Sequence, residues 1–345
     1  MAHKIGVMGC GNVATYGHLP AIRDTDGLDL HALFDPNTGQ VRDLASPQRF
    51  DVPHACDNED DFFAADLDAV AICSPAPFHE ANVNAAAARG LPILCEKPLS
   101  MDHPQGQRMI DTCEAAGVPL YVAFCYRFSP SAMRIKELVA EGAIGDVRSL
   151  RLIYNWDCHG KYNWRDPKKG IAEHRHGRML EGGPMVDCGT HQIDLARWWT
   201  GSDVVRATGH GAWADDYEAP DHVYGHLDHA DGTHTMVEMS YSYGHTMKEP
   251  ESSFVYQLIG TAGVIVYDRN IGRFELRNAE GTFPQTFHHE KDFAGMYRAY
   301  RKALDTGEPG DLPTAAEGLR VTDLAVSLTE QAVASRKTAA ALPGV

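Results

Sequence analysis

A short apolar run that breaks into glycines near residue 10 constrains the fold of this chain more than any other feature. Residues 4–8 indicate a strand, and Gly9-Cys10-Gly11-Asn12-Val13-Ala14 then indicates a tight turn and the start of a helix. Gly9 would make the turn, Gly11 would let backbone touch a diphosphate, and Ala14 would keep the helix close to the sheet. The N–H groups at the helix start, at Asn12 and Val13, would bind the phosphates. The pattern predicts a dinucleotide site, although glycine clusters also serve turns that bind nothing.

An acidic residue follows at the spacing that ribose binding requires. The apolar run from Leu28 to Phe34 ends in Asp35, close to the ~20-residue spacing of the dinucleotide fingerprint. A carboxylate there would accept hydrogen bonds from both ribose hydroxyls and repel a 2′-phosphate, so NAD is favoured over NADP. Alternatively, Asp35-Pro36-Asn37 is an ordinary turn that caps the next helix, which is compatible with ribose binding.

The pattern of strands and helices changes once along the chain. Up to Arg127 short apolar runs alternate with helical segments, and the run over 68–73 is typical of a parallel strand buried on both faces. Beyond it we expect a helix over 129–141, a long strand over 146–156, a helix over 185–199, mostly antiparallel strands over 204–276, and helices over 291–305 and 314–336. The prediction is an α/β fold with a doubly wound parallel sheet of the Rossmann type in residues 1–127, and an α+β domain with an open, mainly antiparallel sheet in residues 128–345.

Composition excludes several classes of protein. A chain of 345 residues can form two domains with full cores, and a net charge of −16 argues against a nucleic-acid partner. No apolar run approaches the ~18 residues of a membrane helix, and the first strand begins too early for a signal peptide, so we expect a cytoplasmic protein with no membrane partner. The 8 cysteines form no C-x-x-C pair, and Cys73, Cys95 and Cys125 lie in expected strands, which indicates reduced core thiols.

Two further motifs follow expected strands of the first domain. Ser74, Pro75 and His79 come after the strand over 68–73, and Glu96-Lys97-Pro98 comes after the strand over 92–95. The carboxyl ends of parallel strands meet at one edge, where open α/β sheets bind their ligands. Lys97 could therefore reach a cofactor ribose and a substrate hydroxyl together. The alternative for each motif is a solvated loop.

A third motif lies at the start of the helix expected over 185–199. Asp187, His191 and Asp194 are spaced i, i+4 and i+7, which places two carboxylates and an imidazole on one helical face. A histidine held by a carboxylate is a better base, which suits removal of a hydroxyl proton. The alternative is a hydrogen-bonded polar seam.

Taken together, the order and spacing of these motifs closely resemble the Gfo/Idh/MocA family of sugar and inositol oxidoreductases over nearly the whole chain. Tyr126-Arg127-Phe128 at the domain boundary belongs to the same pattern. The resemblance implies that Lys97, Asp187 and His191 are the catalytic set, and that the nicotinamide lies between the two domains. It implies cofactor contacts from Gly9, Gly11, Asn12, Val13, Asp35, Ser74, Pro75, His79, Glu96 and Lys97. It implies substrate contacts from Lys97, Tyr126, Arg127, Asp187 and His191.

The segment over 157–178 departs from a regular pattern of strands and helices. Trp156, Tyr162 and Trp164 could stack on a sugar face, and Arg175, His176 and Arg178 could bind a carboxylate, sulfonate or phosphate. A surface or subunit-contact loop is the alternative. The spacing of Cys158, His159, His174 and His176 matches no strong zinc pattern, so we predict no metal site. The series His222, His226, His229 and His234 is expected to decorate a hairpin.

Three functions remain open at this stage. The first is an NAD-dependent dehydrogenase or reductase acting on a hydroxyl or ketone of a sugar, sugar acid, cyclitol or glycoside. The second is a redox-neutral glycoside hydrolase that uses bound NAD transiently, and the third is a non-catalytic NAD-binding regulator, for which Lys97, Asp187 and His191 would be unnecessary. Because the open sheet leaves an apolar face, we also expect a homodimer or homotetramer.

Overall fold

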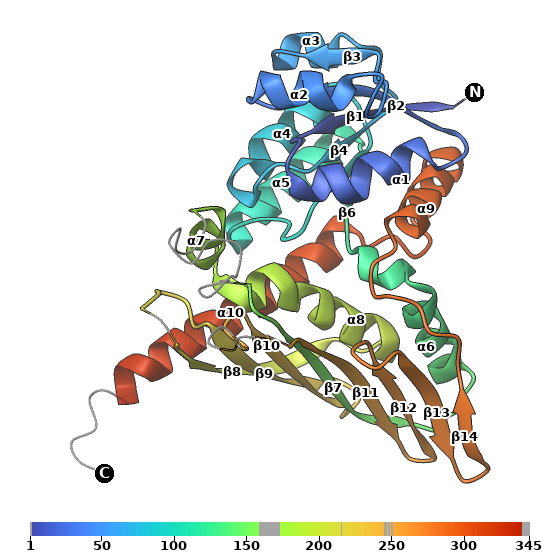
Figure 1. The fold of residues 1–345 in the computed structure, drawn as a ribbon, viewed down its shortest axis with the longest axis vertical. Helices are drawn as coiled ribbons and strands as arrows, with labels where there is room; N and C mark the ends of the chain where they lie inside the picture. The colour runs from blue at the N-terminus through green and yellow to red at the C-terminus, as the bar shows by residue number, and fades with distance from the viewer. Residues whose placement is uncertain are drawn as a thin grey trace. The chain divides into compact units, whose positions relative to one another are not determined.

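The computed structural model describes residues 2–158, 173–214, 216–244, 247, 249 and 251–339, with the backbone alone at 173–176 and 337–339. Its contacts divide the chain into two compact units, each drawn in Figure 1. Unit 1 comprises Met1–Phe128 and Lys291–Thr322, and unit 2 comprises Ser129–Glu290 and Asp323–Val345. Each unit is described separately below.

A six-stranded parallel sheet is the core of unit 1. Its order is β3-β2-β1-β4-β5-β6, which places β1 and β4 side by side where the strand order reverses. All four residues of β4 are buried, as the apolar run predicts. The strands are β1 His3–Met8, β2 Leu28–Phe34, β3 His54–Cys56, β4 Ala69–Ile72, β5 Ile93–Cys95 and β6 Leu120–Val122.

Helices connect these strands, and their ends carry recognisable capping residues. A carboxylate oxygen of Asp102 accepts the Gln105 N–H at the start of α5, and Gly117 ends α5 in the left-handed region. The first helical segment, η1, is a π-helix, which the sequence pattern did not predict. The helices up to residue 128 are η1 Ala14–His18, α1 Leu19–Arg23, α2 Thr38–Ala45, α3 Glu59–Phe63, η2 Ala76–Phe78, α4 His79–Ala87, α5 His103–Ala116 and η3 Cys125–Phe128.

Residues Lys291–Thr322 belong to unit 1, whereas the sequence prediction assigned them to the second domain. The segment carries α9 (Phe293–Thr306) and the first part of α10 (Ala315–Ala339). Tyr300 is fully buried in α9 and donates its hydroxyl to the Pro92 carbonyl oxygen over 3.0 Å. The Val122 N–H bonds to the Pro313 carbonyl over 2.9 Å. The segment thus supplies a hydrogen-bond acceptor to edge strand β6 and buries its aromatic side chains in unit 1. No local sequence pattern indicates that the polypeptide comes back to the first unit.

An eight-stranded sheet is the core of unit 2, in the order β14-β13-β12-β11-β7-β10-β9-β8. All neighbouring strands are antiparallel except β7 and β10, which are parallel, so the predicted fold class is confirmed. The strands are β7 Val147–Asn155, β8 Val204–Ala212, β9 His222–His229, β10 His234–Ser240, β11 Ser253–Gly260, β12 Gly263–Asp268, β13 Arg273–Asn278 and β14 Gly281–Pro284.

Helices cover one face of this sheet (Figure 1). Those wholly within unit 2 are α6 Pro130–Ala140, α7 Glu173–Leu180, η4 Met185–Gly189 and α8 Thr190–Thr200. The later part of α10 packs directly on β8, because a Cβ at Gly209 would lie 2.7 Å from the carbonyl carbon of Leu328. Only glycine permits this approach.

The opposite face of the sheet carries a mixture of polar and apolar side chains. The histidines of the β9–β10 hairpin alternate as expected, since His229 is buried while His226 and His234 are partly exposed. Among the described parts of unit 2, no helix packs on this face (Figure 1). The expected self-association stays a prediction. None of the 8 cysteines forms a disulfide, and no described helix is long and apolar enough to cross a membrane.

Candidate functional site

The two glycines of the turn after β1 differ in whether the fold has room for a side chain. Gly9 has φ +91°, and a Cβ there would lie 2.6 Å from the carbonyl carbon of Cys73 and 2.7 Å from the Cα of Ser74. The backbone after β4 therefore excludes any other residue at position 9. A Cβ at Gly11 would meet nothing within 4 Å. The fold itself does not require glycine at position 11, but a ligand that approaches the backbone would.

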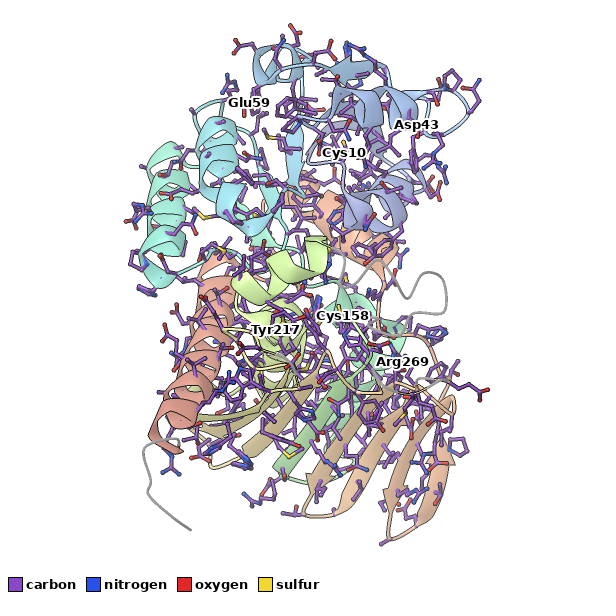
Figure 2. All side chains as sticks on the ribbon, turned by 60° about the vertical axis from the view of Figure 1, so that its left-hand side comes forward. Cys10, Asp43, Glu59, Cys158, Tyr217 and Arg269 are labelled. Atoms are coloured by element: carbon purple, nitrogen blue, oxygen red, sulfur yellow. The ribbon has the colours of Figure 1, made fainter. Side chains whose placement is uncertain are left out.

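Asp35 holds this turn in place. Its Oδ2 accepts the Cys10 N–H over 2.8 Å and its Oδ1 accepts the Asn37 N–H over 2.8 Å. The Gln40 amide donates to the Cys10 carbonyl, and Cys10 is labelled in Figure 2. The turn alternative for Asp35-Pro36-Asn37 is thus observed, and Asn37 is the residue that caps α2. Each carboxylate oxygen keeps a further lone pair, so the residue is still able to accept ribose hydroxyls. Asn12 is exposed and Val13 is helical, which leaves the start of the helix accessible within unit 1.

His79 is buried between two loops of unit 1. The ring is 1% exposed, and its Nε2 lies 2.8 Å from the Ser74 carbonyl oxygen while its Nδ1 lies 3.1 Å from the Leu99 carbonyl oxygen. A neutral imidazole has one N–H, so the ring donates to one of these carbonyls while its other nitrogen lies against the second. Both nitrogens thus face backbone, and His79 joins two loops. Ser74 itself is partly exposed, and Pro75 is exposed.

Glu96 is buried directly after β5, where its carboxylate contacts His18 and the Lys97 backbone N–H. Its Oε1 lies 2.8 Å from His18 Nε2, and its Oε2 accepts the Lys97 backbone N–H over 3.1 Å. Burial alone raises the pKa of Glu96, but His18, the charge of Lys97 and that N–H together hold it below its ordinary value. The residue is therefore ionised and anchors the backbone of Lys97, whose own side chain is partly exposed.

Tyr126 and Arg127 are buried in unit 1. Tyr126 is 2% exposed and Arg127 is 3% exposed. The Arg127 guanidinium pairs with Glu317 Oε1 over 3.1 Å and donates to the Asp311 carbonyl over 3.4 Å. These contacts tie η3 to the start of α10. They give Arg127 a structural role within unit 1, and its expected substrate contact stays a prediction.

Asp187 is the centre of a polar cluster in unit 2. Its Oδ2 accepts hydrogen bonds from Arg178 and from the Tyr241 hydroxyl, and the Cys188 thiol lies 3.5 Å away. The charge of Asp187 raises the pKa of Arg178, and burial followed by that same charge raises the pKa of Tyr241 far above its ordinary value. Tyr241 is therefore a protonated donor and Arg178 a cation, and both stabilise the Asp187 carboxylate.

His191 and Asp194 lie in α8, where they are 5% and 0% exposed. Asp187 belongs to the preceding π-helix η4, so the i, i+4 geometry assumed for Asp187 and His191 does not apply. Single π-turns inside helices are frequent at functional sites, because the extra residue per turn redirects side chains. The spacing of polar and apolar residues does not distinguish such a turn from an α-helix.

Aromatic and small side chains surround the Asp187 cluster. Trp156 stacks on Tyr154 with ring centroids 5.8 Å apart, and it meets the edge of Tyr241 at 5.9 Å. Cys158 is buried beside Tyr241, with Tyr217 packed against the same group (Figure 2). The indole ring of Trp156 thus packs against Tyr154 and Tyr241 of the protein itself.

Several predicted residues lie in or beside the segment that the structure does not describe. Trp164, Tyr162 and His159 lie outside the described residues, and only the backbone is described for His174, Arg175 and His176. Within the described part of the chain, no group of three or more metal-binding side chains is arranged to hold an ion.

The sequence prediction missed residues that the fold brings to these loops. His18 lies in η1 and Tyr297 in α9, and both contact the Glu96 network. Tyr241, at the end of β10, and Gly17, whose Cβ would lie 2.7 Å from the Phe293 ring, were also missed. His18 follows the glycine turn closely in sequence, so a contact near this turn could have been expected for it. The other partners are too distant in sequence to be found by local patterns.

Comparison with known proteins identifies relatives over the same regions. Residues 3–124 match the oxidoreductase family with an NAD-binding Rossmann fold, and residues 132–266 match the GFO/IDH/MocA C-terminal domain. D-xylose 1-dehydrogenase (NADP(+)) 2 of Haloferax volcanii is 29% identical over 314 residues, which cover 88% of this chain and 89% of that enzyme. Inositol 2-dehydrogenase of Corynebacterium glutamicum is 31% identical over 205 residues, which cover 59% of this chain and 55% of that enzyme.

A solved structure shows the same fold. It is an oxidoreductase from Agrobacterium radiobacter in complex with NAD+, L-tartaric acid and magnesium. Its TM-score is 0.82 at 21% identity, and the alignment covers 97% of this chain and 98% of that one.

The two glycines of the turn should respond differently to alanine. Gly9→Ala should destabilise unit 1 by about 2 kcal/mol or more, because both the conformation and the space exclude a Cβ. Gly11→Ala should change the unfolding free energy by less than about 0.5 kcal/mol and weaken NAD binding at least ~10-fold, since the methyl group blocks close approach of the diphosphate. Chemical unfolding and calorimetric titration with NAD measure the two effects. Undiminished NAD binding by Gly11→Ala would contradict the assignment.

His79 should make the stability of unit 1 depend on pH. Burial lowers its pKa below the ordinary 6.5. Below pH 6.5 the unfolded chain therefore binds a proton that the folded chain does not, and the unfolding free energy falls until the folded pKa is reached.

The variant His79→Asn should be less stable at pH 7.5 but lose less stability between pH 7 and 5, by up to about 1.4 kcal/mol per pH unit. Urea unfolding at several pH values measures this slope. If two unfolding transitions are seen, the one that Gly9→Ala shifts belongs to unit 1. His289→Gln, at a ring 78% exposed in unit 2, is the control. An unchanged slope in His79→Asn would refute the role of this histidine.

Proposed function

Because this chain belongs to the GFO/IDH/MocA family of oxidoreductases, we propose that it is an NAD-dependent dehydrogenase acting on a secondary hydroxyl or ketone of a sugar, sugar acid, cyclitol or glycoside. The observation that carries the proposal lies in unit 1. The glycine turn held by Asp35 and the Lys97 loop held by Glu96 follow strands of one parallel sheet at its carboxyl edge. That edge is where such sheets bind their ligands.

The residues of unit 1 fit a nicotinamide dinucleotide. Gly11 leaves open space against the backbone, the helix start at Asn12 and Val13 carries N–H groups, and Asp35 keeps acceptor capacity. The negative charge of Asp35 supports a preference for NAD over NADP. Since an NADP(+)-dependent enzyme is among the relatives, this preference is tested by comparing kcat/KM for the two cofactors.

We assign the chemistry to Lys97, His191 and Asp187. The bound cofactor supplies a hydride acceptor. His191 takes the proton from the substrate hydroxyl as general base, and Lys97 donates a hydrogen bond to the same oxygen. Asp187, kept ionised by Arg178 and Tyr241, orients His191 or a neighbouring hydroxyl of the substrate. In the reverse direction His191 returns the proton to the carbonyl oxygen.

Substrate recognition is proposed to come from unit 2. Arg178 reaches Asp187 with one nitrogen, and its side chain is 41% exposed. The segment before it contributes Trp164, Arg175 and His176 as proposed contacts. Arg127 is not included, because its guanidinium is bound by Glu317.

A substrate panel tests the function. Purified protein is incubated with NAD or NADP and a series of sugars, sugar acids, inositols and glycosides, while NADH absorbance and aglycone release are followed together. We expect stoichiometric NADH from one class of polyol. Aglycone release without net NADH would instead show the redox-neutral hydrolase, and tight NAD binding without either product would favour the regulator.

Replacing Lys97 by alanine should separate catalysis from cofactor binding. We expect Lys97→Ala to lower kcat by at least ~100-fold, because the developing charge on the oxygen loses its donor. NAD affinity, measured by calorimetry, should change by less than about threefold, since the glycine turn and Asp35 are intact. Lys4→Ala, which removes a lysine paired with Asp66 in the same unit, is the control. Turnover above a tenth of the original would contradict the assigned role.

A further inference from the structure

A chain of three buried polar side chains lies behind Lys97 in unit 1. Tyr297 Oη is 2.7 Å from His18 Nδ1, and His18 Nε2 is 2.8 Å from Glu96 Oε1. Tyr297 and His18 are 0% exposed and Glu96 is 5% exposed. They come from α9, η1 and the end of β5, so three separate segments converge on this contact.

Hydrogen bonds link these three side chains in series, and the Glu96 carboxylate fixes one end of the series. The ionised Glu96 only accepts hydrogen bonds, so the N–H of His18 points at it from Nε2. His18 Nδ1 and the Tyr297 hydroxyl share the next hydrogen bond, over 2.7 Å. Burial raises the pKa of Tyr297 well above its ordinary value, which keeps that hydroxyl protonated. The rings of Phe293 and Tyr297 pack on His18 with centroids 5.2 and 5.6 Å away.

This series of hydrogen bonds ends at the backbone of Lys97. Glu96 Oε2 accepts the Lys97 backbone N–H over 3.1 Å. The charge of Lys97 is also one of the causes that hold the pKa of Glu96 down. Because the interaction between two titrating groups is mutual, Glu96 acts on the protonation of Lys97 to the same extent. Glu96 thus connects His18 and Tyr297 to the Lys97 backbone.

We propose that His18 and Tyr297 are positioning residues that orient the Glu96 carboxylate and thereby set the position and protonation of Lys97; the catalytic use of Lys97 rests on the function proposed above. A purely structural role explains the arrangement less well, because burying an ionised carboxylate costs more free energy than packing apolar side chains in the same space. Tyr300 provides the comparison, since it is equally buried in α9 but donates only to the Pro92 carbonyl.

The experiment measures the titration of Lys97 directly. Lysines of the intact protein are labelled by reductive methylation with ¹³C-formaldehyde, and the Lys97 signal is assigned by its loss in Lys97→Arg. The pKa of Lys97 is then followed by NMR in the original protein, Glu96→Gln, Tyr297→Phe and the matched control Tyr300→Phe. Each phenylalanine variant removes one buried hydroxyl and one hydrogen bond.

We expect Glu96→Gln to lower the Lys97 pKa by about 1 pH unit, because the neighbouring negative charge is lost. Tyr297→Phe should lower it by a smaller amount in the same direction, since His18 loses the partner that holds it against Glu96. Tyr300→Phe should leave it within about 0.2 pH units, although it destabilises the protein to a similar degree. With a substrate from the panel, Tyr297→Phe should lower kcat ~3- to 10-fold, with KM unchanged and the pH profile shifted as the NMR titration shifts.

An unchanged Lys97 titration in Tyr297→Phe overturns the proposal, and so does an equal shift in Tyr300→Phe. If Glu96→Gln does not fold, Tyr297→Phe alone decides. The NMR titration needs no substrate, so it still decides this proposal if the panel finds no turnover and the proposed function fails.

Discussion

The close approach between the turn after β1 and the backbone after β4 is the constraint on which the rest of unit 1 depends. It requires Gly9 in a left-handed conformation against Cys73 and Ser74. Asp35 binds the same turn from the end of β2. Three strand ends are thereby brought to one edge of the sheet. The start of the first helix and the Lys97 loop both lie at this edge.

Buried polar side chains, and not surface charges, hold the functional loops in place. His79 joins the Ser74 and Leu99 carbonyls, Glu96 joins His18 to the Lys97 backbone, and Arg127 joins η3 to Glu317. Leaving such groups without partners in the interior is costly, so each loop has few alternative conformations. In unit 2 the Asp187 carboxylate has the same function for Arg178 and Tyr241.

Local patterns predicted the features that depend on neighbouring residues. The glycine turn, the buried strand β4, the β9–β10 hairpin and both sheet types follow from periodicity and turn residues. The protein partners of Arg127 and His79 could not be predicted, because they belong to segments that local spacing does not relate to these residues. The catalytic roles of Lys97, Asp187 and His191 remain predictions.

By itself, the sequence determined the two kinds of sheet, the dinucleotide turn and the order of the polar motifs, since these depend on residues a few positions apart. Only the tertiary structure decided that residues 291–322 belong to unit 1, that Asp187 lies in a π-helical turn, and that Tyr297 contacts His18 across 279 positions of the chain. The physical reason is that hydrogen bonds between buried groups are chosen by packing. Packing brings together segments whose separation in sequence carries no periodic signal.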